Sequence, residues 1–64
     1  MNFDKLRGVM AEKRITQSAL AIHLGLSVKT INAKLNGKVD FTVDEANSIV
    51  KFVGIENPTE IFFD

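Results

Sequence analysis

Apolar residues recur every three or four positions along most of the chain, a spacing typical of helices that pack on one core. We expect five helices and no strands, with the helices spanning about residues 2–13, 17–24, 27–36, 43–53 and 58–63. The residues expected on their inner sides are Phe3, Leu6, Val9, Met10, Leu20, Ala21, Leu24, Ile31, Leu35, Val43, Ala46, Ile49, Val50 and Val53. The pattern predicts a single all-α domain over residues 1–64.

Residues that start and stop helices stand at the ends of these segments. Thr16, Ser27 and Thr42 each precede a segment, and each hydroxyl can accept a hydrogen bond from the first helical turn. Thr42 and Glu45 also have the spacing of a capping box. Each of the three middle segments is followed by a residue that adopts positive φ without strain, namely Gly25, Gly37 and Gly54.

The stretch 17–37 has the layout of two short helices joined by a tight turn. Ala21 lies where a second helix must cross closely, Gly25 ends the first helix, and Ile31 faces the shared core from the second. Gln17, Ala21, Gly25 and Ile31 stand at the intervals of a helix-turn-helix, which places its second helix in a DNA major groove. A generic helical hairpin that does not bind DNA is the alternative.

Composition excludes several classes of protein. The chain has no cysteine, so disulfides and thiolate metal sites are ruled out. No apolar run approaches the roughly 18–20 residues needed to cross a bilayer, and the N-terminus lacks the apolar centre of a signal peptide. We therefore expect a cytoplasmic protein with no membrane partner.

Charge is distributed unevenly along a chain whose net charge is zero. Residues 1–38 carry seven basic and two acidic side chains (net +5), and residues 39–64 carry one basic and six acidic (net −5). Because phosphate binding depends on basic residues, this asymmetry indicates a basic functional face and an acidic far side. Two ordinary solvated surfaces are the alternative.

No arrangement of residues points to catalysis. His23 is the only histidine, it has no cysteine or second histidine with which to share a metal, and it is expected to be an exposed helical residue. The acidic residues lack the spacing of a calcium loop. We expect no enzyme activity, no metal or cofactor, and no small-molecule ligand.

The whole chain resembles the lambda-repressor and Cro type of helix-turn-helix, the Xre-like family of phage and bacterial regulators. The resemblance rests on Leu6-Arg7, Ile15-Thr16-Gln17, Leu20-Ala21, Leu24-Gly25-Leu26-Ser27, Ile31, Leu35-Asn36-Gly37, Phe41-Thr42 and Glu60-Ile61-Phe62-Phe63. It implies a five-helix DNA-binding domain and a transcriptional regulator (a repressor or Cro-like protein). It also implies a dimer bound to a double-stranded operator with an inverted repeat.

The expected recognition helix covers about residues 27–36 and has one apolar and one polar side. At about 100° per residue, the side opposite Ile31 carries Lys29, Asn32, Ala33 and Asn36, with Thr30 and Lys34 at one edge and Val28 at the other. Lysine matches guanine O6 and N7, asparagine matches adenine N6 and N7, and small apolar side chains contact thymine methyl groups. The expected base-reading residues are Val28, Lys29, Asn32 and Ala33. For Val28, packing at the buried edge is the alternative.

Other residues are expected to position the protein on DNA phosphates. Gln17 begins a helix, where the helix dipole and the backbone donors favour an anion. The resemblance implies that Gln17 binds the DNA backbone and braces the recognition helix, and that Asn36 and Lys38 bind phosphates after it. The full expected phosphate and positioning set is Gln17, Ser27, Thr30, Asn36 and Lys38.

Large apolar residues gather at the C-terminus. Ile61, Phe62 and Phe63 are expected at a dimer interface, and closure of the core is the alternative. The competing function is a protein-interaction module or an antitoxin-like protein that keeps this fold and binds DNA weakly.

Overall fold

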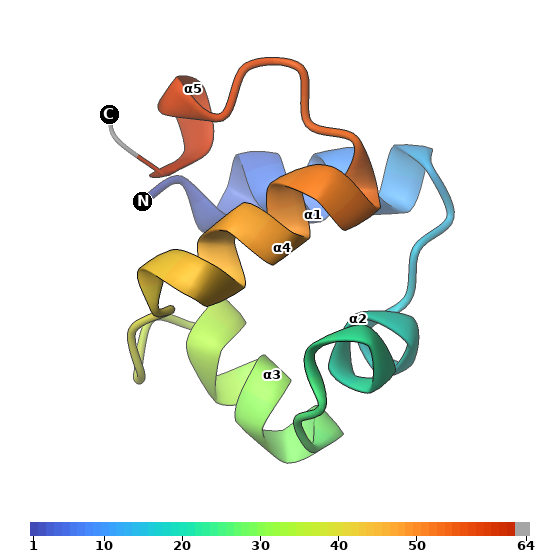
Figure 1. The fold of residues 1–64 in the computed structure, drawn as a ribbon, viewed down its shortest axis with the longest axis vertical. Coiled ribbons are helices and arrows are strands. Elements are labelled where there is room, and N and C mark those ends of the chain that lie inside the picture. Colours follow the sequence, from blue (N-terminus) through green and yellow to red (C-terminus); the bar gives the residue numbers. More distant parts are fainter. Residues whose placement is uncertain (63–64) are drawn as a thin grey trace.

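The structure, a computed structural model, describes residues 1–62 and contains five helices in that range. They are α1 (Phe3–Glu12), α2 (Gln17–Leu24), α3 (Val28–Leu35), α4 (Val43–Val53) and α5 (Thr59–Phe62) (Figure 1). Residues 1–62 contain no strand, and the predicted helix ends within this range lie within one residue of the observed ones. The predicted end of the fifth helix, at Phe63, lies outside the described residues. The predicted all-α, five-helix architecture is confirmed.

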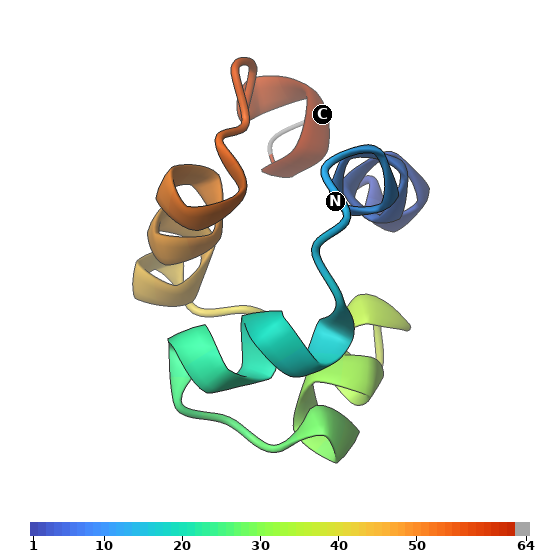
Figure 2. The same cartoon turned by 90° about the vertical axis from the view of Figure 1, so that its right-hand side faces the viewer.

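The helices surround one core. Figure 2 shows α1 and α4 on opposite sides, α5 between them at one end, and α2 with α3 closing the other end. The backbone N–H of Asn2 donates to the carbonyl of Ile61 at 2.7 Å, which fastens α5 to the start of α1. The buried apolar residues, each at most 3% exposed, are Leu6, Met10, Leu20, Ala21, Ile31, Leu35, Ile49, Val53 and Ile61.

The predicted helix starts are formed by side-chain caps. The hydroxyls of Thr16 and Ser27 accept hydrogen bonds from the first turns of α2 and α3. At the start of α4, the Thr42 hydroxyl accepts from the Glu45 N–H at 3.1 Å, and a Glu45 carboxylate oxygen accepts from the Thr42 N–H at 2.9 Å. This reciprocal pair is the predicted capping box.

The turn between α2 and α3 depends on the backbone of Gly25, which has a φ of 70°. The N–H of Leu26 donates back to the carbonyl of Ala21 at 2.9 Å, so the chain reverses within one residue of the helix end. Ala21 is 2% exposed, and its single methyl group lets α2 and α3 approach closely. The helix–turn–helix arrangement of residues 17–35 follows from these two small residues.

Helix α1 ends in a similar way but without a glycine. Arg14 has a φ of 59°, the only positive φ at a non-glycine residue among the described residues. The N–H of Ile15 donates to the carbonyl of Met10 at 2.8 Å, which mirrors the bond made by Leu26. Left-handed backbone conformation costs an L-residue about 1–2 kcal/mol, so this turn is strained.

The predicted inner side of α4 was wrong at one position. Val43 was expected in the core but is 76% exposed. At about 100° per residue, Val43 lies about 120° around the axis from Ile49, which is fully buried. Ala46 and Val50 lie between these directions and are half-buried, so the apolar stripe of α4 is wider than the surface that the core covers.

Replacing Arg14 with glycine should stabilise the protein. We expect Arg14→Gly to raise the free energy of unfolding by about 0.5–1 kcal/mol, because the relief of left-handed strain exceeds the greater entropy of the unfolded chain. The matched opposite change is Gly25→Ala, where a Cβ meets no atom within 4 Å and only backbone strain acts. It should cost about 1 kcal/mol. Denaturant unfolding measures both, and a loss of stability in Arg14→Gly would contradict the assigned strain.

Candidate nucleic-acid interface

Helix α3 separates its residues into a buried and an exposed side. Ile31 and Leu35 are fully buried, and Lys34 is 6% exposed. Val28 is 47% exposed, so it is not a core residue. The exposed residues of this helix and its C-cap are Val28, Lys29, Asn32 and Asn36, and Thr30 and Ala33 are half-buried.

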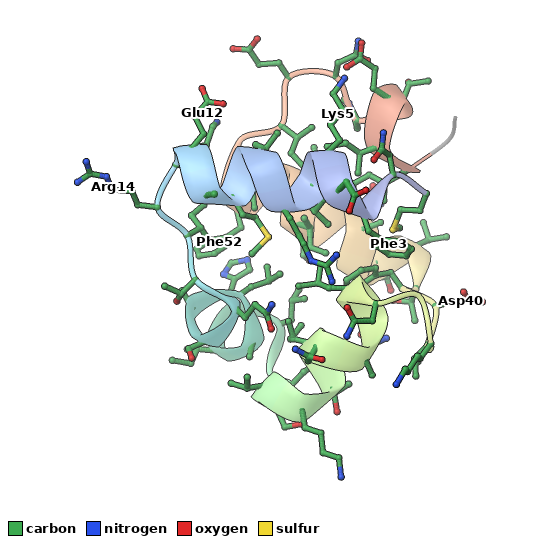
Figure 3. All side chains as sticks on the ribbon, turned by 180° about the vertical axis from the view of Figure 1, so that it is seen from behind. Phe3, Lys5, Glu12, Arg14, Asp40 and Phe52 are labelled. Carbon is green, nitrogen blue, oxygen red and sulfur yellow. The ribbon has the colours of Figure 1, made fainter. Side chains whose placement is uncertain are left out.

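Lys34 was predicted at the edge of the exposed side, but it lies on the buried side of α3. Its ammonium donates to a Glu45 carboxylate oxygen at 2.7 Å and to the backbone carbonyl of Asp40 at 2.9 Å. It also lies 5.5 Å from the centre of the Phe41 ring, within range of a cation–π contact. The Asp40 side chain itself extends into solvent (Figure 3). Lys34 therefore joins α3, the following loop and α4.

The ion pair changes the acidity of Glu45. The hydrogen bond from Lys34, together with the one from the Thr42 N–H, lowers the pKa of the Glu45 carboxyl below its ordinary value. Burial acts in the opposite direction but is outweighed. The side chains of Lys34 and Glu45 are 8% and 19% exposed, so solvent screens this pair less than a surface pair.

Hydrogen bonds between polar side chains connect α1, the end of α3 and the start of α2. A guanidinium nitrogen of Arg7 on α1 donates to Asn36 Oδ1, and Asn36 Nδ2 donates to Asn32 Oδ1 at 2.8 Å. Asn32 Nδ2 in turn donates to Gln17 Oε1 on α2 at 3.4 Å. Three predicted site residues, Gln17, Asn32 and Asn36, are thus brought together. Arg7 joins them although no short-range spacing in the sequence connects positions 7 and 36.

The hydroxyls of Ser27 and Thr30, at the start of α3, are hydrogen-bonded to each other. Ser27 Oγ accepts from the Thr30 N–H at 3.1 Å and donates to Thr30 Oγ1 at 2.9 Å. Because Thr30 Oγ1 accepts this hydrogen bond, its own hydrogen remains available as a donor. Lys38 lies beyond the end of α3 and is exposed.

Three basic residues of the first half of the chain, residues 1–38, are bonded to the second half. Lys5 forms an ion pair with Glu60 on the side of α1 that faces away from α2 and α3 (Figure 3). Lys13 Nζ donates to the carbonyl of Gly54 at 2.8 Å, and Lys34 is the third basic residue bonded to the second half. The other four basic residues of this half are Arg7, Arg14, Lys29 and Lys38.

His23 is exposed, and it has a packing partner. Its ring stacks on that of Phe52 in α4, with ring centres 4.1 Å apart and planes inclined by 11°. Among residues 1–62, no group of three or more His, Cys, Asp or Glu side chains is placed to hold a metal ion. No helix in the same range is long and apolar enough to cross a membrane.

The C-terminal apolar residues divide between core and surface. Ile61 is 1% exposed within a single chain, so it closes the core and has no surface left for a partner. This corrects its expected place in a dimer interface. Phe62 is half-buried and lines an apolar groove of about 230 Å³ with Val43 and Val50. Phe63 lies outside the described residues.

Comparison with known proteins places the chain in one family. Residues 1–64 match the family described as "Protein of unknown function (DUF739)", and the chain belongs to this family. Searches of curated proteins and of solved structures found no match. The family's description names no activity.

Removing the Lys34 ammonium should destabilise the protein. We expect Lys34→Met to lower the free energy of unfolding by about 1–3 kcal/mol, because the stem is kept while the Glu45 carboxylate loses its main donor. Lys51→Met, at an exposed lysine of α4, is the matched control and should change stability by less than about 0.5 kcal/mol. Denaturant unfolding at neutral pH measures both. Equal, small effects of the two substitutions would show that Lys34 does not hold α3.

Stability should depend on pH through Glu45. Since its pKa is lower in the folded state, its contribution is complete above the ordinary pKa of a glutamate and is lost as pH falls through the folded-state value. Glu45→Gln keeps the capping box but carries no charge. The stability difference between wild type and Glu45→Gln should therefore shrink on acidification from about pH 7 to about pH 3. A constant difference over that range would exclude the ion pair as its cause.

Proposed function

We propose that this protein is a sequence-specific double-stranded DNA-binding protein of the lambda-repressor and Cro type, with α3 as its recognition helix. The observation that carries the proposal is the division of α3 into a core-packed side, with Ile31 and Leu35, and an exposed side that carries Val28, Lys29 and Asn32. A helix with its side chains is about 10–12 Å across, which fits the roughly 12 Å width of the major groove.

The outer residues of α3 are suited to contact base edges. Lys29 donates to guanine O6 and N7, and Asn32 pairs with adenine N6 and N7. Val28 and Ala33 pack against thymine methyl groups. The 47% exposure of Val28 supports this role over packing in the core.

Phosphate contacts would fix the register of α3 on the duplex. Gln17 begins α2, where the helix dipole and first-turn N–H groups favour an anion. Asn36 and Lys38 lie at and beyond the end of α3 and flank it from the other side. Ser27 and Thr30 stand at its start, where the Thr30 hydroxyl supplies a donor.

The proposed biological role is that of a small cytoplasmic transcriptional regulator acting as a dimer. Two copies related by a two-fold axis would read an operator with an inverted repeat. Phe62 and the groove between α4 and α5 offer apolar surface that a second copy would cover.

A protein-interaction module, or an antitoxin-like protein on this fold, is the second candidate. Ile22 on α2 is 82% exposed and Val43 on α4 is 76% exposed, which leaves apolar surface for a protein partner. Zero net charge also fits this candidate. It predicts weak, salt-sensitive DNA binding without sequence preference.

Selection of binders from a random duplex pool tests the proposed function. We expect an enriched inverted repeat whose half-sites lie about one helical turn apart, because a symmetric dimer presents two copies of α3 at that separation. Absence of any enriched sequence, with weak binding that disappears as salt rises, would favour the protein-interaction candidate.

Two substitutions should separate base contacts from phosphate contacts. Lys29→Ala should relax preference at one base pair by about 1–3 kcal/mol. Lys38→Ala should weaken binding to selected and scrambled duplexes alike and give a shallower salt dependence. Titrating both variants against both duplexes measures this. If Lys29→Ala lost equal affinity for the two duplexes, Lys29 would not be a base-reading residue.

A further inference from the structure

Arg7, on a helix outside the helix-turn-helix, begins the line of hydrogen bonds that runs through Asn36 and Asn32 to Gln17. We refer to the amide side chains of Asn36, Asn32 and Gln17 as the amide string. Every link has the same direction, with a nitrogen donating to the oxygen of the next residue. The string therefore has a polarity, and Arg7 stands at its donor end.

The chemistry of the guanidinium determines this polarity. Arginine has five N–H donors and no acceptor, so Asn36 must turn its amide oxygen toward Arg7. The Asn36 nitrogen then faces Asn32, and each later amide follows in the same sense. An amide side chain alone has no such preference, because exchanging its oxygen and nitrogen changes its outline very little.

Polarity decides what the string presents to a ligand. Asn32 uses one of its two N–H donors toward Gln17 and one oxygen lone pair toward Asn36, so one donor and one lone pair remain. Adenine N7 and N6–H require that pair of groups on a side chain of fixed orientation. Gln17 accepts through its oxygen, so its amide nitrogen is left to donate to a phosphate oxygen.

We propose that Arg7 is a positioning residue for DNA recognition, which sets the polarity of the amide string and thereby fixes the Asn32 amide in the orientation that reads adenine. This inference rests on the proposed function. Arg7 is well placed for it, because it is half-buried and lines two open hollows beside α3. One of about 390 Å³ also contains Asn36, and the other, of about 220 Å³, contains Gln17.

The test uses three variants of the full chain. Arg7→Met removes every donor and the charge, Arg7→Lys keeps a donor and the charge, and Lys51→Met removes one charge at an exposed position on α4. Denaturant unfolding first establishes that each variant is folded. The side-chain NH₂ signals of Asn32, Asn36 and Gln17 are then recorded by NMR in the free protein. The affinity of each variant is then measured for two duplexes. One carries the sequence enriched in the selection, and the other has the adenine–thymine pair expected to contact Asn32 replaced.

We expect Arg7→Met to shift the Asn32 and Asn36 side-chain amide signals toward those of freely rotating amides. Discrimination between the two duplexes should fall about tenfold, the size of one good base contact. Lys51→Met should change neither, and Arg7→Lys should retain most of the discrimination because lysine also only donates.

Several results would overturn the proposal in distinguishable ways. Unchanged amide signals in Arg7→Met would show that Arg7 does not set the polarity. Equal loss on both duplexes, with a shallower salt dependence, would make Arg7 a phosphate contact only. If the wild-type protein preferred no duplex, the proposed function would fail together with the recognition role of Arg7. The amide signals would still decide whether Arg7 orders the string.

Discussion

The buried ammonium of Lys34 is the interaction on which the placement of α3 depends. It is the one charged side chain buried among the described residues, and it bonds the Asp40 carbonyl and the Glu45 carboxylate. Glu45 also caps α4. The Lys34 ammonium therefore connects the buried side of α3 to the loop at Asp40 and to the start of α4. On its exposed side, α3 is connected to α1 and α2 by the hydrogen bonds of Arg7 and the amide string. A recognition helix must be rigid in this way, because an error of an ångström misplaces its donors.

Most of the fold could be predicted from local signals. Helix ends depend on residues within one turn of them, so the caps at Thr16, Ser27 and Thr42 and the glycine stops were readable from sequence. The exposure of Val43 was not, because it depends on how far the core extends beneath α4. The left-handed backbone at Arg14 was also missed, since arginine gives no local sign of a positive φ.

The exposure of the candidate residues on α3 could be predicted from sequence, but the hydrogen bonds among them could not. Periodicity placed Lys29, Asn32 and Asn36 on the exposed side of α3, and the structure places them there. Periodicity wrongly placed Lys34 at the edge of that side. An angle around a helix axis does not reveal that the chain at Asp40 and Glu45 folds back over Lys34. Arg7 meets Asn36 across 29 residues of sequence, and contacts at such separation follow only from tertiary structure.

The proposed function requires that the exposed side of α3 and the first turn of α2 form the surface that meets DNA. A titration with a duplex that carries a single half-site, at moderate salt, with backbone amide chemical shifts mapped at each step, tests this surface without contributions from a second bound copy. We expect the largest changes between Val28 and Lys38 and around Gln17, with little change in α4 and α5. Changes centred on Val43 and Phe62, or none at saturating duplex, would contradict it.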